Sequence, residues 1–157
     1  TGARFGECLG MTWDCIDLDN KTIRIEKGFD YHFTNDFTEG KTKSSKRKIT
    51  IPDKLVEILQ TLTIPDDLTQ RVFKRVSNNA INKALQLALN RAGINKDITF
   101  HAMRHTHASI LLANGVQLLS VSKRLGHADP NITLHTYAHI IEELEQEDNE
   151  KLNSIFN

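Results

Sequence analysis

Hydrophobic positions recur at helical spacing through most of the chain. Between residues 55 and 62, four apolar side chains fall at i, i+3, i+4 and i+7, which lines one face of a helix. Other runs are bracketed by residues suited to helix ends, namely Ser77, Gly93, Gly115 and Gly126. The pattern predicts helices over 4–11, 52–62, 77–92, 101–114 and 118–125, one that starts at Asp129-Pro130, and a last one over 142–156.

Three shorter segments alternate between apolar and polar residues, as half-buried strands do. They span 16–18, 22–25 and 48–51, with a turn at Asp19-Asn20 and a stop at Pro52. A chain of 157 residues, 39% of them hydrophobic, fits one domain with a proper core. The fold class is therefore predicted as mainly α with a small three-stranded antiparallel β-sheet, in a single domain over 1–157.

The predicted helix over 101–114 carries an imidazole and a guanidinium on one face. His101 and Arg104 are three residues apart, and we expect Met103 and Ile110 on the opposite, core-facing side. An arginine offers a planar fork of N–H donors with a permanent charge, which suits a phosphate. The alternative is an ordinary solvated helix face.

Charge is distributed unevenly along the chain although the formal net charge is zero. Residues 1–137 carry 19 Lys and Arg against 14 Asp and Glu, whereas residues 138–157 carry 1 against 6. One basic segment comprises Lys41, Lys43, Lys46, Arg47 and Lys48. Because salt limits electrostatic reach to about 10 Å, this segment can attract phosphate whatever the distant acidic end does. A solvated loop is the alternative for this segment.

Two more residues stand out near the end of the chain. Gly126 is expected to end a helix in a left-handed turn, which places His127 at the start of a loop. Tyr137 follows on the next predicted helix, and taken alone it could be a packed tyrosine with a solvated hydroxyl.

Cys8 and Cys15 lack the pattern of a disulfide framework or a zinc site, and no segment is apolar enough to span a bilayer or direct export. These features predict a reduced, cytoplasmic protein without a membrane partner.

Several motifs occur together in one order: TGARFGE at 1–7, GKTK at 40–43, HAMRHTHA at 101–108, LGH at 125–127 and TYAH at 136–139. Together they resemble the tyrosine recombinase, or phage integrase, family, and specifically its catalytic domain. Single motifs of this length are common by chance, whereas five in order over nearly the whole chain are specific.

The resemblance implies a site-specific DNA recombinase that cleaves and rejoins strands through a 3′-phosphotyrosine, without metal, ATP or any other cofactor. Arg4, His101, Arg104 and His127 would bind the scissile phosphate, Tyr137 would attack it, Lys41 would protonate the leaving oxygen, and Glu7 would support the site. Lys43, Lys46, Arg47 and Lys48 would contact DNA. The expected partners are double-stranded DNA and further protomers, as a tetramer on DNA, in a bacterial or mobile-element setting.

The same resemblance implies a chain truncated at its N-terminus, with an acidic tail over 141–157 that docks in cis or in trans.

The residues themselves leave three other functions possible. The helices over 101–114 and 118–125 could form a non-catalytic helix-turn-helix-like DNA-binding module, and a type IB topoisomerase-like enzyme shares much of the site. The pairs His101 with His105 and His135 with His139 have zinc-ligand spacing, but they lack the glutamate of a metallo-hydrolase helix.

Overall fold

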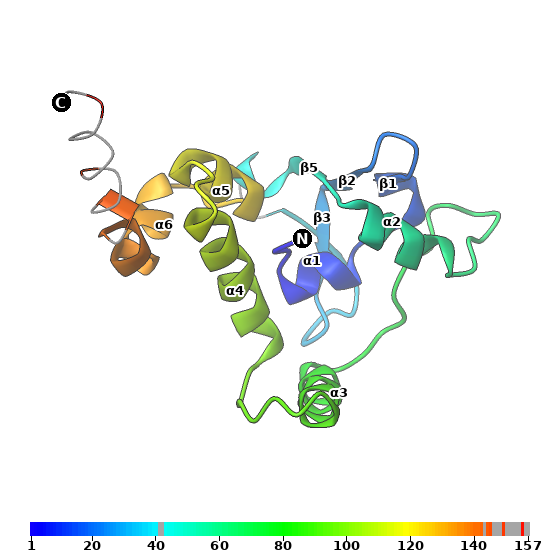
Figure 1. Cartoon of the computed structure of the whole chain (residues 1–157). Coiled ribbons are helices and arrows are strands. Elements are labelled where there is room, and N and C mark those ends of the chain that lie inside the picture. The colour runs from blue at the N-terminus through cyan, green and yellow to red at the C-terminus, as the bar shows by residue number, and fades with distance from the viewer. Residues whose placement is uncertain (41–42, 143, 146–148, 150–154, 156–157) are drawn as a thin grey trace.

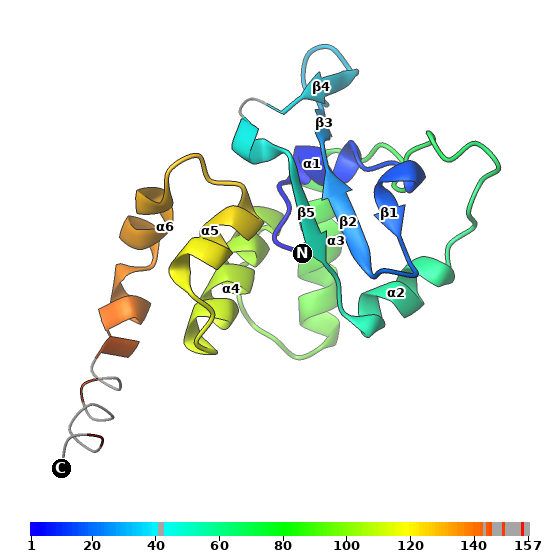
Figure 2. The ribbon, with the colours of Figure 1, turned by 90° about the horizontal axis from the view of Figure 1, so that it is seen from above.

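The computed structural model describes residues 1–40, 43–142, 144–145, 149 and 155. Figure 1 shows two groups of elements side by side: a sheet region with α1 and α2, and a helical region with α4, α5 and α6. α3 lies apart from the sheet and joins the helical region through α4 (Figures 1 and 2). None of the helices in the described part of the chain is both long and apolar enough to cross a membrane.

The predicted three-stranded sheet is confirmed. β2 (Thr22–Ile25) lies between β1 (Ile16–Asp17) and β5 (Arg47–Thr50), and both pairings are antiparallel. Ile23 lies opposite Ile16 on one side and Ile49 on the other, so alternate positions bury apolar side chains against the core. This sheet cluster also includes residues of α2 (Asp53–Gln60) and Met11, which follows α1 (Phe5–Leu9).

A second, two-stranded sheet was not predicted. β3 (Lys27–Phe29) pairs with β4 (Phe37–Glu39), and the rings of Phe29 and Phe37 meet edge to face at 5.8 Å. Every residue of β4 is exposed, so the sequence has no buried alternation that would mark this strand. The 3-10 turns η1 (Trp13–Cys15) and η2 (Lys43–Ser45) complete this region.

The helical region and α3 comprise four predicted helices with caps close to those expected. They are α3 (Asn78–Arg91), α4 (Phe100–Ala113), α5 (Leu118–Leu125) and α6 (Pro130–Thr136). Ser77 and Asp129 accept hydrogen bonds from backbone N–H groups at the starts of α3 and α6, and Gly126 ends α5 with a φ of 71°. No residue of α3 is buried, so its apolar residues are at most half-buried.

The predicted core face of α4 is wrong. Met103 and Ile110 are 49% and 56% exposed, whereas the buried residues are Arg104, Ala108 and Leu112, four positions apart. Ala108 and Leu112 pack with Tyr137 and residues of α5 in the second hydrophobic cluster, so the helix is rotated about its axis relative to the prediction. Arg104 therefore lies on the inner face of the helix and not on a solvated one.

Tyr137 stands just outside α6 and not within it as predicted. It is the C-cap residue, with φ −120° and ψ 22°. The hydroxyl of Thr136 donates to the carbonyl of Ile132 one turn earlier, a contact that bends helices and favours their ends. Helical backbone resumes over 138–142, but most of the predicted last helix, 142–156, lies outside the described residues.

Candidate active site

Two arginines from distant parts of the chain meet at the turn after α5. Arg104 Nη2 donates to the carbonyl of Leu125 at 2.7 Å, and Arg4 Nη2 donates to the carbonyl of Gly126 at 3.3 Å. Arg104 Nη1 also donates to Gly2 O at 2.5 Å, which ties α4 to the segment before α1. The left-handed conformation of Gly126 presents these consecutive carbonyls, so the predicted convergence of Arg4 and Arg104 has a structural basis.

Arg104 is a buried cation held by neutral groups. The residue is 5% exposed, and it makes no ion pair within the described part of the chain. Burial and then the charge of Arg4 lower the pKa of Arg104 to about 10, so the guanidinium stays charged at neutral pH. A buried charge without a counter-ion is costly, and an incoming anion would offset that cost.

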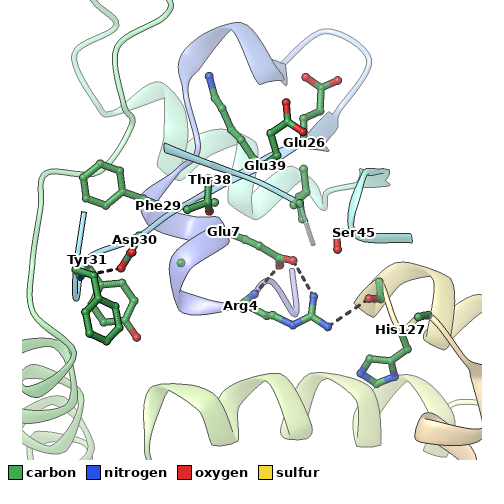
Figure 3. A pocket seen from close by; sticks show the side chains of 18 of the residues that line it. Arg4, Glu7, Glu26, Phe29, Asp30, Tyr31, Thr38, Glu39, Ser45 and His127 are labelled. Carbon is green, nitrogen blue, oxygen red and sulfur yellow. Dashed lines mark hydrogen bonds and ion pairs between the residues drawn. The ribbon is translucent and has the colours of Figure 1, made fainter. Parts of the chain in front are cut away.

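Glu7 links Arg4 to the sheet through Arg47. Its carboxylate accepts hydrogen bonds from Arg4 Nη1 at 2.9 Å and from the Arg4 backbone N–H at 2.8 Å (Figure 3). It also accepts from Arg47 Nη1 and Nη2 at 3.0 and 2.9 Å. Burial alone would raise the pKa of Glu7, but the hydrogen bonds and charges of Arg47 and Arg4 lower it below its ordinary value.

Arg47, which the resemblance implies as a DNA contact, has a buried side chain in the structure. Its side chain is 7% exposed, because it pairs with Glu7 and donates through Nε to the carbonyl of Arg124 at 2.6 Å. A Cβ atom on Gly126 would lie 2.6 Å from Arg47 Nη1, so glycine is required there for space as well as for its positive φ. Arg47 thus joins β5 to the turn that both site arginines contact.

Of the neighbouring lysines whose side chains the structure describes, Lys48 does not share a face with Arg47. Lys48 follows it on β5, so its side chain points to the other face of the sheet, where it lines a second cavity with Trp13. Lys46 is exposed. Lys41 and the side chain of Lys43 lie outside the described residues, so the structure does not place the predicted general acid.

His127 begins the loop after Gly126, as predicted. Its Nδ1 is 2.7 Å from the hydroxyl of Thr133, which is fully buried on α6. Burial, followed by the charges of Arg104 and Arg4, lowers the pKa of His127 to about 4, so the ring is neutral at pH 7. If the threonine hydroxyl donates to Nδ1, the ring proton sits on Nε2 and is available to an anion. Thr133 was not identified from the sequence.

His101 and Arg104 both belong to α4, but only Arg104 is buried. His101 is exposed, and burial, His105, Arg104 and Arg4 together lower its pKa. The rings of His101 and His105 meet edge to face, with their centroids 5.1 Å apart. The helix thus presents two imidazoles outward beside an inward guanidinium.

Tyr137 is 3% exposed, and its ring packs with Ala108, Leu112 and Leu125. Its hydroxyl meets His105 Nδ1 at 2.9 Å. Burial raises the pKa of the phenol, and the charge of Arg104 opposes this rise only partly, so the phenol is protonated at neutral pH. His105 was not predicted as a residue of the recombinase site, although it directly follows Arg104 and lies one turn from His101.

A cavity of about 650 Å³ opens between α1, the β3–β4 hairpin and the turn before α6. Arg4, Glu7 and His127 line it together with Tyr31 and Thr38 (Figure 3). Arg104, His101 and Tyr137 are not among its lining residues. Within the described ranges, His, Cys, Asp and Glu side chains form no group of three that could hold a metal ion. The arrangement can bind an anion beside Arg4 and His127, with Arg104 directly behind the same turn.

The phage integrase family model matches residues 1–143. The chain is 32% identical to the integrase of Staphylococcus phage L54a and 33% identical to a XerC-like tyrosine recombinase of Caldanaerobacter subterraneus, in each case over 99% of this chain. These alignments cover 49% and 47% of the two relatives, so the chain spans about half their length.

Solved structures share the fold. The Tn1549 transposon integrase, in complex with transposon right-end DNA, matches with a TM-score of 0.75 at 21% identity, over 98% of this chain and 55% of that one. The catalytic domain of bacteriophage HP1 integrase matches with a TM-score of 0.57 at 26% identity, over 89% of this chain and 68% of that one. The fold is therefore that of a tyrosine recombinase catalytic domain, as predicted.

Proposed function

Because this chain belongs to the phage integrase family, we propose that it is the catalytic part of a site-specific DNA recombinase. It cleaves and rejoins DNA strands through a 3′-phosphotyrosine intermediate, without metal or nucleotide. The observation that carries this proposal is the meeting of Arg4 and Arg104 at the two carbonyls before His127, with Tyr137 on the neighbouring chain segment. DNA-bound integrase structures with the same fold support double-stranded DNA as the partner.

Phosphodiester cleavage depends on neutralising negative charge at the transferring phosphate. In the proposed site this is the role of Arg4, His101, Arg104 and His127, with Glu7 holding Arg4 in place. Removing one such donor is expected to cost about 3–4 kcal/mol, on the order of a thousandfold in rate. Tyr137 is the nucleophile and Lys41 the acid for the leaving 5′ oxygen. Lys43 and Lys46 supply contacts to the DNA backbone, whereas Lys48 lies on the other face of the sheet.

Covalent trapping tests this proposal. Wild type and Tyr137→Phe are incubated with a pool of nicked duplexes, and protein-linked DNA is resolved on denaturing gels. The nick lets the cleaved strand diffuse away, so the phosphotyrosine accumulates. We expect an adduct only with wild type, while both proteins retain similar binding in a shift assay. An adduct that survives in Tyr137→Phe would contradict the assignment, and binding without any adduct would favour a non-catalytic DNA-binding module.

Three further measurements separate the remaining alternatives. Joining of two specific sites is expected of a recombinase, whereas relaxation of supercoiled DNA without site preference would indicate a type IB topoisomerase-like enzyme. Activity that a chelator abolishes would favour a metal-dependent hydrolase. We also propose that the protein acts as a tetramer on DNA in the cytoplasm of a bacterium. The phage and bacterial sources of the relatives support an origin in a phage or mobile element.

The acidic segment over 141–157 is proposed to dock onto its own domain or onto a neighbouring protomer. Its charge, six Asp and Glu against one Lys over 138–157, suits a basic surface. Deleting 141–157 and measuring oligomeric state with and without DNA tests this idea. Loss of the DNA-bound oligomer supports docking in trans, and an unchanged state contradicts it.

A further inference from the structure

The hydroxyl of Tyr137 has a hydrogen-bond partner that the roles above leave unused. We propose that His105 is a catalytic residue, the base that takes the proton from Tyr137 as the phenol attacks phosphorus. This inference rests on the proposed function and adds the group that activates the nucleophile. It assigns a reaction step to a histidine that the sequence motifs alone do not single out.

The geometry of this pair is that of an acid and its base. His105 Nδ1 lies 2.9 Å from Tyr137 Oη, within the distance required for direct proton transfer. The phenol has no second hydrogen-bond partner within the described part of the chain. Its ring is fixed by Ala108, Leu112 and Leu125, so the hydroxyl is held against α4. Because the ring is fixed and the hydroxyl has one partner among the described residues, the proton of Tyr137 has a direct path to His105.

A base is needed because this phenol does not ionise unaided. A free tyrosine has a pKa near 10, so only about one molecule in a thousand is ionised at neutral pH. In this structure burial raises the pKa of Tyr137, and Arg104 offsets the rise only in part. The arginines that stabilise the phosphate therefore do not by themselves generate the phenolate in the DNA-free state.

Other groups around the hydroxyl are less suited to this role. His101 contacts the edge of the His105 ring at a centroid distance of 5.1 Å but makes no described hydrogen bond to Tyr137. His127 is engaged by Thr133 through Nδ1. The charged and titratable groups around His105 are His101 and Arg104 from α4, His127 from the turn after α5, and Tyr137 from the end of α6.

The proposed step conserves atoms and charge. During cleavage the O–H bond of Tyr137 breaks, its proton moves to His105 Nδ1, the Oη–P bond forms and the P–O5′ bond breaks. The 5′ oxygen takes a proton from a separate acid. During rejoining the new 5′-hydroxyl attacks phosphorus and gives its proton back to the deprotonated acid, the P–Oη bond breaks, and His105 returns its proton to the phenolate. His105 thus ends each cycle in its starting state.

The matched test variant is His105→Asn. The amide oxygen of asparagine can occupy the place of Nδ1 and accept the phenol hydrogen bond, but it cannot take up the proton. It therefore keeps the positioning contact and removes the base. His105 is an exposed residue, so the substitution should leave folding intact, which the thermal midpoint checks. A second variant, His139→Asn, changes an exposed histidine of the next segment and is the control.

Single-turnover adduct formation is measured on the nicked duplex that wild type selects from the pool, at pH 6 to 10. We expect His105→Asn to be slower by about 100-fold at pH 7, the lower end of the usual effect of a general base. The defect should shrink as pH rises, because hydroxide then ionises the phenol. His139→Asn should match wild type throughout.

A duplex with sulfur in place of the bridging 5′ oxygen separates base from acid, since a thiolate leaves without a proton. The defect of His105→Asn should persist on this substrate, whereas loss of the acid should be rescued. A wild-type rate for His105→Asn, a defect independent of pH, or rescue by sulfur would each overturn the role of His105. No adduct with wild type would instead overturn the proposed function, and this inference with it.

Discussion

The sheet region and the helical region each contribute an arginine to the site, but they hold it by different means. On the sheet side, Arg4 shares the carboxylate of Glu7 with Arg47, so positive charge is compensated within the protein. On the helical side, Arg104 is held by two backbone carbonyls and makes no ion pair among the described residues. His127, beside the turn after α5, is neutral at pH 7.

This difference gives the two regions different roles at the site. A carboxylate that neutralises an arginine fixes its position but weakens its attraction for an anion. A carbonyl fixes position while leaving the full charge available. We conclude that the sheet region mainly secures the geometry of the site, and that Arg104 carries the larger share of the uncompensated charge for the phosphate.

The largest expected effect tests Arg104 directly. Arg104→Gln removes the buried charge and should lower the single-turnover rate of adduct formation by on the order of a thousandfold. Arg91→Gln, at the exposed end of α3, is the control and should leave the rate unchanged. A loss of less than tenfold in Arg104→Gln would show that the helical side is not the main source of positive charge.

Glu7→Gln should mainly affect stability. It leaves the buried guanidinium of Arg47 without its counter-charge, which costs roughly 3–5 kcal/mol of the free energy of unfolding. Urea unfolding can be followed by the fluorescence of Trp13, a buried residue of the sheet region. Glu57→Gln breaks an exposed pair with Lys54 and should cost no more than about 1 kcal/mol. Equal losses in the two variants would refute the supporting role of Glu7.

Thr133 tests how the helical region holds the ring of His127. Thr133→Val keeps the shape of the buried side chain but removes the hydroxyl that meets His127 Nδ1. We expect a rate about fivefold lower, because one hydrogen bond of about 1 kcal/mol fixes the ring and its tautomer. Thr133→Ser retains the hydroxyl and should recover most of the rate. Equal rates in the valine and serine variants would exclude a role for this contact.

A last comparison concerns stability against pH. The pKa of His127 is about 4 in the folded chain and about 6.5 when unfolded, so the unfolded chain binds the extra proton. The stabilisation is complete above pH 6.5 and is lost as pH falls toward 4. Replacing His127 by Asn should flatten the fall in the urea midpoint between pH 6.5 and 5, above the range in which Glu7 titrates. An unchanged slope would contradict this assignment.

Much of the architecture could be predicted because it depends on local signals. Helix caps at Ser77 and Asp129 and the left-handed Gly126 are decided by neighbouring residues, and the structure confirms them. The strand over 37–39 could not be predicted, because its exposed residues carry no periodic pattern. The rotation of α4 was also missed, since buried Arg104 takes a position that hydrophobic periodicity assigns to an apolar residue.

The sequence by itself determined which chemical groups are present and in what order: two arginines, the histidines and a tyrosine at family-like spacing. Only the tertiary structure decided their partners. Arg47 meets Glu7 across 40 positions and Arg104 meets Gly2 across 102, while the tyrosine hydroxyl turns to His105. Hydrogen bonds and charge interactions act over a few ångströms in space, so no local pattern along the chain specifies which distant groups will form them.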